Sequence, residues 1–179
     1  MPEIEIRPAI ANDIPALFAL EHNYTSDHVW QVDVQADENQ VQVTFRETRL
    51  PRSVRVDYPR KVEALADNWM KRSALLIASL ESIPIGYISL RDDIAPSTTW
   101  IDDLVVMRRL RRQGIGTALV LAAQNRCSQL SYRRVVMEMQ SKNHPAICLA
   151  QKLGFDFSGY NERYFSNLDI AIFFAKIIA

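Results

Sequence analysis

The junction between a strand and a helix near residue 110 constrains the fold of this chain more than any other feature. Residues 104–120 read LVVMRRLRRQGIGTALV, in which an apolar strand leads through four arginines and two glycines into a helix. The first turn of a helix leaves backbone N–H groups unpaired and carries about half a positive charge, so it can hold a phosphate. Gly114 and Gly116 have no Cβ atom that would block a close approach. The junction therefore predicts a site for a phosphate-bearing ligand in a chain that mixes helices and strands.

The spacing of the glycines excludes two common phosphate loops. A Walker loop needs GxxxxGK[ST] and a dinucleotide fingerprint needs GxGxxG after a first strand, and neither pattern occurs here. The chain has 21 basic and 21 acidic side chains, which gives a formal net charge of zero. A general nucleic-acid binder or a protein of anionic membrane surfaces would need a basic excess. We therefore expect neither a nucleic acid nor a membrane as partner.

The cysteines and histidines form no motif. Cys127 and Cys148 make no CxxC pair and have no metal-ligand spacing with the three histidines, so we expect no disulfide scaffold and no metal site. Both cysteines lie at apolar positions of predicted helices, which indicates buried thiols. The first residues, MPEIEIRPAI, do not form a signal peptide, and the apolar run at 170–175 is too short to span a membrane. We expect a cytoplasmic protein.

The order of apolar patterns predicts one α+β domain over residues 1–179. Alternating residues indicate strands, and apolar residues three or four apart indicate helices. The expected strands are 3–7, 74–80, 85–90, 99–107, 135–140 and two within 155–178, and the expected helices are 12–22, 61–72, 114–130 and 143–153. Between 28 and 58 the alternation, interrupted at 36–39 and 50–53, predicts an additional three-strand meander.

The phosphate loop resembles that of a known superfamily. The spacing Arg111-x-x-Gly114-x-Gly116, preceded by Leu104-x-Val106, is similar to the acetyl-CoA loop of the GNAT N-acetyltransferases. This resemblance implies that the donor is acetyl-CoA.

A second match follows the first at the expected distance. Asn143-x-x-Ala146 and the KLGF run at 152–155 resemble the next conserved region of the same superfamily, so the resemblance covers nearly the whole chain. It implies a layered α/β/α fold with a mixed, mostly antiparallel sheet and helices on both faces. In that fold the sheet splays between the cofactor strand and the next parallel strand, and the 28–58 segment lies on the acceptor side.

The chain resembles two subgroups of the superfamily, and these imply different acceptor substrates. The residues Glu138-x-Gln140-x-x-Asn143-x-Pro145-Ala146 look most like streptothricin acetyltransferases, and so does the ending from 158 to 174. The segment 163–165 and the position of Glu138 also resemble N-terminal protein acetyltransferases of the ribosomal-protein type. The chemistry implied by the two resemblances is the same.

The resemblance assigns the cofactor site residue by residue. The pantetheine arm would pair with Leu104–Val106, the pyrophosphate would rest on amides from Arg111 to Thr117, and Asn143 would contact the cofactor. Backbone N–H groups around Val105 and Val106 would polarise the thioester carbonyl. The complete implied set is Leu104, Val105, Val106, Arg111, Arg112, Gln113, Gly114, Ile115, Gly116, Thr117 and Asn143.

The acceptor amine must lose a proton before it attacks, which favours a nearby carboxylate. Glu138 is the first choice, and Asp102 and Asp103 are the alternatives. Strand alternation predicts that the two aspartates point to opposite faces, with Asp102 on the side of Leu104 and Val106.

One position departs from the superfamily pattern. Many members have a tyrosine four residues before the glycine that ends the second helix, where it acts as general acid, and this chain has Ala150. Tyr160 or Tyr164 can take that role from the final hairpin. Alternatively, the thiolate leaves unassisted, since a thiol pKa near 8.5 makes it a fair leaving group.

These expectations lead to one main function and two alternatives. The main one is an N-acetyltransferase that moves an acetyl group from acetyl-CoA to a small-molecule amine, directly and in a ternary complex. The alternatives are a protein or peptide N-terminal acetyltransferase, which the bulky 28–58 segment disfavours, and a non-catalytic acyl-CoA-binding module, which Ala150 keeps open. The resemblance also allows a homodimer through edge strands.

Overall fold

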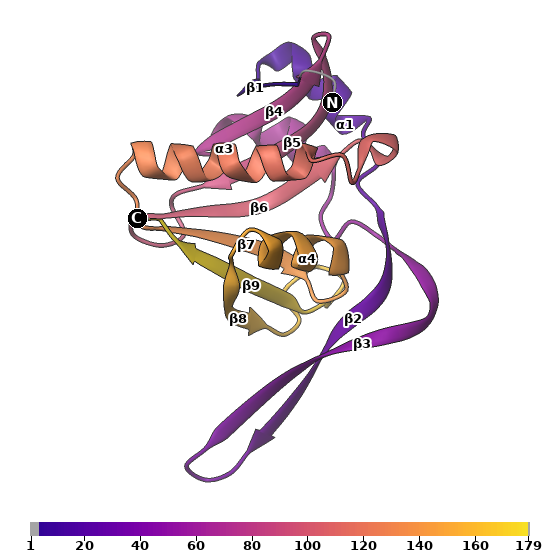
Figure 1. Cartoon of the computed structure of the whole chain (residues 1–179), viewed down its shortest axis with the longest axis vertical. Helices are drawn as coiled ribbons and strands as arrows, with labels where there is room; N and C mark the ends of the chain where they lie inside the picture. Colours follow the sequence, from indigo (N-terminus) through magenta and orange to yellow (C-terminus); the bar gives the residue numbers. More distant parts are fainter. Residues whose placement is uncertain (1–3, 179) are drawn as a thin grey trace.

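A seven-stranded sheet with the order β1-β4-β5-β6-β7-β9-β8 forms the centre of the computed structural model, which describes residues 4–178 (Figure 1). In that order the strands are β1 (Glu5–Pro8), β4 (Ala74–Leu80), β5 (Ile83–Arg91), β6 (Thr98–Val106), β7 (Arg134–Gln140), β9 (Ala171–Ile177) and β8 (Asp156–Asn161). Neighbouring strands run antiparallel except β6 and β7, which run parallel. The sheet is therefore mixed and mostly antiparallel, as expected.

Helices cover both faces of this sheet. The helices are α1 (Ile14–Phe18), α2 (Glu63–Asn68), α3 (Ile115–Gln129) and α4 (His144–Lys152). One apolar cluster joins α3 and α4 to Ile88 of β5, and a second joins α1 and α2 to Tyr87, the neighbouring residue. Because successive residues of a strand point to opposite faces, β5 contributes to both layers of the core. Within residues 4–178, every helix is too short or too polar to cross a membrane.

The sheet opens between its two parallel strands. β6 and β7 pair only from Thr98 opposite Arg134 to Ile101 opposite Met137. Beyond that point, β6 stays paired with β5 and β7 stays paired with β9. The expected splay is therefore present, and it leaves one edge of the second half of β6 without a neighbouring strand.

The segment 28–58 differs from the predicted three-strand meander. It forms a two-stranded arm, β2 (Tyr24–Ala36) and β3 (Val41–Val56), which extends away from the main sheet (Figure 1). The turn at 36–39 is present, but the residues at 50–53 do not reverse the chain. They form a large bulge, because Arg49 pairs with His28 and Val54 already pairs with Ser26. Pro51, which has no N–H to donate, is accommodated at this bulge.

Gly86 allows β5 and β6 to approach closely next to the open part of the sheet. A Cβ atom at this position would lie 2.8 Å from the carbonyl oxygen of Val105, a backbone atom that cannot move away cheaply.

We predict that Gly86→Ala lowers the free energy of unfolding by about 2 kcal/mol, measured by urea denaturation. The matched control is Gly116→Ala, whose Cβ would meet only side chains at 3.5 Å or more. Equal stability of the two variants would contradict this explanation.

Candidate active site

Six consecutive residues at the start of α3 present free backbone N–H groups. The N–H groups of residues 112–117 donate to no backbone carbonyl among residues 4–178, and regular helical bonding begins with Ala118 N–H to Gly114 O at 3.0 Å. Gly114, directly before the helix, has a φ of 86°, a left-handed conformation that glycine adopts without strain. This geometry suits an anionic group, so the assignment of 112–117 to a pyrophosphate stays a prediction with structural support.

Arg111 joins the end of β6 to an earlier part of the chain. Its guanidinium donates to three backbone carbonyls, those of Glu21 at 2.6 Å, Asn23 at 2.9 Å and Val106 at 2.9 Å. Its own N–H donates to Arg108 O at 3.2 Å. Burial lowers the pKa of Arg111. These contacts position residues 21–23 against the end of β6, and a contact between Arg111 and the cofactor stays a prediction.

The open edge of β6 presents backbone groups toward the splay. Met107 N–H donates to Ile85 O at 2.8 Å, which fixes the hydrogen-bonding alternation between β5 and β6. In an antiparallel ladder this alternation directs the N–H of Val105 toward β5, and those of Leu104 and Val106 away from it. Of the two amides predicted to polarise a carbonyl, only that of Val106 therefore faces the opening.

Asn143 caps α4. Its side-chain oxygen accepts a hydrogen bond from Ala146 N–H at 3.2 Å. This is an ordinary helix cap, and contact between Asn143 and a cofactor stays a prediction.

Three buried carboxylates lie where β6 and β7 separate. Asp102 and Asp103 are on β6, and Glu138 directly follows the last residue of β7 that pairs with β6; each is less than 10% exposed. A register shift places Asp103 opposite Ser89 and Ile101 opposite Leu90, so Asp102 is an inserted residue and the strand alternation is interrupted there. The side chain of Asp102 pairs with Arg72 and that of Asp103 with Arg60, and their placement on opposite faces stays a prediction.

Two arginines from the segment before β4 neutralise most of this negative charge. Arg60 forms ion pairs with Glu138 and, at 3.3 Å, with Asp103, and it donates to the carbonyl of Asp102 at 2.9 Å. Arg72 pairs with Asp102 at 2.5 Å. The three carboxylates raise the pKa of Arg60 despite its burial. Sequence reasoning missed both arginines, because neither belongs to a motif.

Glu138 accepts hydrogen bonds from three elements. Besides Arg60, Trp100 Nε1 donates at 2.8 Å and Tyr164 Oη donates at 2.9 Å, both to Oε2. The predicted pair of Glu138 and Tyr164 is thus brought together. Burial, reinforced by Glu138, raises the pKa of Tyr164 to about 12, so its hydroxyl stays protonated. Tyr160 packs on Phe45 of the arm.

The buried carboxyl group of Asp103 has a raised pKa. Burial raises its pKa to about 6, although Arg60 and a hydrogen bond from Tyr58 act in the opposite direction. A carboxyl with this pKa is mostly ionised at neutral pH and can still take up a proton.

The two cysteines differ in environment. Cys127 is buried in the core as expected, whereas Cys148 is exposed on α4, which corrects the prediction of two buried thiols.

Sequence comparison identifies the family. The sequence model of the Acetyltransferase (GNAT) family matches residues 41–155, which include β6, the turn before α3, and α4. The chain belongs to the GNAT acetyltransferase family. Membership agrees with the splayed mixed sheet and with helices on both of its faces. A search of curated protein sequences finds no match.

Solved structures share this fold over its full length. A nourseothricin acetyltransferase has a TM-score of 0.84 at 19% identity, with 98% of this chain and 99% of that chain covered. A Bacillus anthracis protein, named provisionally as a streptothricin acetyltransferase and solved with acetyl coenzyme A, has a TM-score of 0.75 at 18% identity, with 98% and 99% covered. The Escherichia coli ribosomal-protein-S18-alanine N-acetyltransferase has a TM-score of 0.68 at 16% identity, with 99% and 95% covered. Because the sequence identities are this low, the structural similarity shows that the chain has the same fold as these proteins and does not show their substrates.

The position of Arg111 predicts a large loss of stability on substitution. Arg111→Gln removes a cation from three carbonyls, and we expect it to lower the free energy of unfolding by about 3 kcal/mol. Arg109→Gln is the matched control, because Arg109 is an exposed arginine two residues earlier with no carboxylate or carbonyl partner among the described residues. Urea denaturation of both variants checks the prediction, and a similar small change in both would contradict it.

The raised pKa of Asp103 predicts a pH-dependent stability. Because its folded-state pKa of about 6 exceeds the ordinary value of about 3.9, the folded protein binds more protons between these limits. The wild type should therefore lose roughly 3 kcal/mol relative to Asp103→Asn as the pH rises from about 3 to about 7, with most of the loss between about pH 4 and pH 6. Urea denaturation of both proteins at several pH values measures the difference. A constant difference would show that Asp103 titrates normally.

Proposed function

We propose that this GNAT acetyltransferase moves an acetyl group from acetyl-CoA to a primary amine of a small molecule, by direct transfer in a ternary complex. The observation that carries the proposal is the juxtaposition of two oppositely charged regions at one opening of the sheet. The free N–H groups of residues 112–117 can hold a pyrophosphate, and the buried carboxylates Asp102, Asp103 and Glu138 can receive a cationic amine.

The residues present fit the donor. Acetyl-CoA, when bound, supplies the acetyl group as a thioester. The amides at the start of α3 would hold its pyrophosphate, and the open edge of β6 has backbone groups for a pantetheine chain. The Val106 N–H would donate a hydrogen bond to the thioester carbonyl and so stabilise negative charge on that oxygen.

The charges of the acceptor side favour a cation. Three carboxylates face two guanidinium groups, Arg60 and Arg72, so the cluster has a net charge of about −1 when all are ionised. A buried site with one uncompensated negative charge attracts an ammonium group. Oδ1 of Asp102 is buried and has no hydrogen-bond partner among the described residues, so it is available to such a group.

Proton removal is assigned to Asp103 in preference to Glu138. Glu138 already accepts hydrogen bonds from Arg60, Trp100 and Tyr164, so its oxygens are occupied by donors. Burial raises the pKa of Asp103 to about 6, which is close to what a general base needs at neutral pH. Glu138, the first choice from sequence, would then orient the acceptor and Tyr164.

Tyr164 suits a positioning role better than that of a general acid. With a pKa of about 12, its hydroxyl would have to give a proton to a thiolate whose conjugate acid has a pKa near 8.5, which is unfavourable. Ala150 is completely buried and offers no alternative at the expected position. We therefore propose that the thiolate leaves without a proton from the protein.

A thiol-release assay with a panel of acceptors tests this function. The panel contains streptothricin, aminoglycosides, polyamines and peptides with free N-termini, and calorimetry with acetyl-CoA precedes it. We expect acetyl-CoA to bind and a small-molecule amine to be acetylated faster than any peptide. Preferred acetylation of peptides would support the N-terminal acetyltransferase alternative, and binding without turnover would support the non-catalytic module.

Variants of the carboxylates test the assignment of the base. Asp103→Asn should lower kcat/KM at least 100-fold and remove the acidic limb of its pH profile near pH 6. Glu138→Gln should lower kcat/KM but keep that limb. Glu162→Gln, at an exposed glutamate of the loop that also bears Tyr164, is the matched control and should behave as wild type. If the limb disappears only in Glu138→Gln, the base is Glu138.

A further inference from the structure

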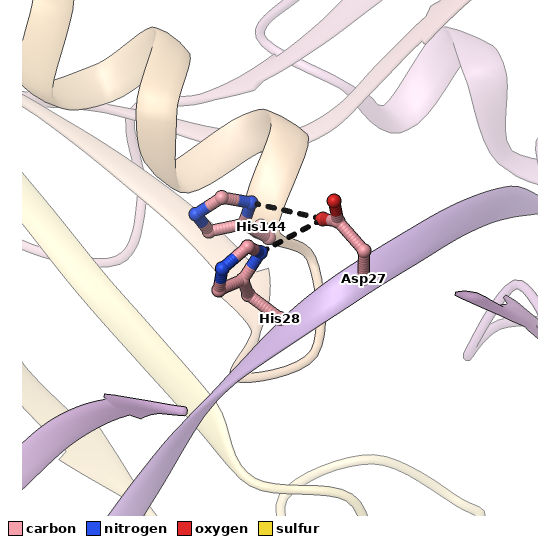
Figure 2. A group of neighbouring side chains, drawn as sticks. All are labelled: Asp27, His28 and His144. Atoms are coloured by element: carbon pink, nitrogen blue, oxygen red, sulfur yellow. Dashed lines mark hydrogen bonds and ion pairs between the residues drawn. The ribbon is translucent and has the colours of Figure 1, made fainter. Parts of the chain in front are cut away.

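Two histidines and an aspartate from separate elements meet where the arm crosses α4. Asp27 and His28 belong to β2, and His144 is the first residue of α4 (Figure 2). Oδ1 of Asp27 lies 2.9 Å from Nδ1 of His28 and 3.7 Å from Nδ1 of His144. The two imidazole rings pack on each other with centroids 4.4 Å apart and an interplanar angle of 31°. This cluster is separate from the carboxylates of the active site.

The spacing of these atoms suits one metal ion. One nitrogen or oxygen from each residue lies within 4.8 Å of the other two. A tetrahedral zinc site has ligands at about 2.1 Å from the metal, and the ligands are then about 3.4 Å from one another. The observed distances of 2.9 and 3.7 Å lie on either side of that value. Small side-chain movements would therefore complete three corners of a tetrahedron.

A fourth residue supports the orientation of His144. Oε2 of Glu47 lies 3.3 Å from Nε2 of His144 and accepts a hydrogen bond from Trp30 Nε1 at the same distance. A carboxylate on the far nitrogen of a metal-bound histidine is the usual outer shell of such sites, since it fixes the tautomer with the proton on Nε2. With the proton on Nε2, Nδ1 of His144, which lies 3.7 Å from Oδ1 of Asp27, would be free to bind a metal ion.

Asp27 supplies a carboxylate oxygen at the exposed side of the cluster, 2.9 Å from Nδ1 of His28. Metal ligands must be deprotonated, so a bound ion would replace the proton that these two atoms share.

We propose that Asp27, His28 and His144 bind a divalent transition-metal ion of the zinc class, with Glu47 as the outer-shell partner of His144. Imidazole ligands favour zinc, copper, nickel and iron over magnesium and calcium, which prefer oxygen. Asp27 is 57% exposed in its side chain, so solvent can supply the fourth ligand. Cys148 does not complete the site, because its sulfur lies 3.4 Å from Nε2, on the side of His144 away from Asp27.

The ion would join two parts of the chain. The arm is held to the body by a backbone hydrogen bond from Trp30 to Ser141 at 2.9 Å and by packing of Trp30 on Phe174. A metal that takes two ligands from β2 and one from α4 would add a link next to these contacts. Because it binds only where the arm and α4 are together, it would stabilise the folded state in proportion to its concentration.

Titration of the tag-free, chelator-treated full chain with ZnCl2 tests the proposal. We expect one zinc per chain with a dissociation constant in the micromolar range or below, and a visible absorption band when CoCl2 replaces zinc. The melting temperature should rise with zinc and not with MgCl2. Absence of zinc uptake at about 100 µM together with absence of a cobalt band overturns the proposal. This experiment uses the wild-type chain and needs no variant.

Variants identify the ligands. His28→Asn and His144→Asn should each weaken zinc binding at least tenfold, and Glu47→Gln should weaken it roughly tenfold through the outer shell. Asp33→Asn, an exposed aspartate further along β2, and Cys148→Ser should bind zinc as wild type does. Retained affinity in a double His28→Asn, His144→Asn variant overturns the assignment, as does loss of binding in Cys148→Ser. Circular dichroism and acetyl-CoA titration of each variant show that it is folded.

Discussion

The separation of β6 from β7 after four paired residues is the constraint on which the rest of the structure depends. A parallel pair that continued to the end of both strands would satisfy every backbone group and leave no site. By diverging, β6 keeps the amides of Leu104 and Val106 free, and the gap receives side chains from both strands. The insertion at Asp102 lies at the same place, where the side chain of Asp102 pairs with Arg72 and that of Asp103 with Arg60.

Most of the negative charge in this gap is balanced by a segment that follows the arm. Arg60 and Arg72 come from the chain between β3 and β4 and pair with carboxylates of β6 and β7. A buried carboxylate without such partners would be strongly destabilising, so the segment is part of the site although it belongs to neither open strand. The burial of Asp103 in this balanced environment is what distinguishes its proton affinity from that of an ordinary surface aspartate.

Much of the fold could be predicted from the sequence, and the site only in part. The turn at Gly114, the α3 and α4 helices and the succession of strands along the chain follow from local patterns of glycine and apolar residues. Such patterns depend on only a few neighbouring residues. The bulges at Asp102 and at 50–53 could not be predicted, because they depend on the register of a partner strand. The contacts of Arg111 could not be predicted, because the sequence shows its neighbours along the chain but not the carbonyls of Glu21 and Asn23. His28 and His144 showed no metal spacing for the same reason, since the fold brings them together over a long separation in sequence.

The two ends of the arm differ in how firmly they are attached to the folded body. Near its base, the arm is held by Trp30, Phe45 and their aromatic neighbours on β8 and β9. Its far end, from Val34 to Val43, has exposed apolar side chains and only its own cross-strand bonds. A two-stranded ribbon without a supporting layer is barely stable in water. We therefore expect the tip to open and close by local fluctuation while the seven-stranded body remains folded, so that a single unfolding free energy would describe the body and not the tip.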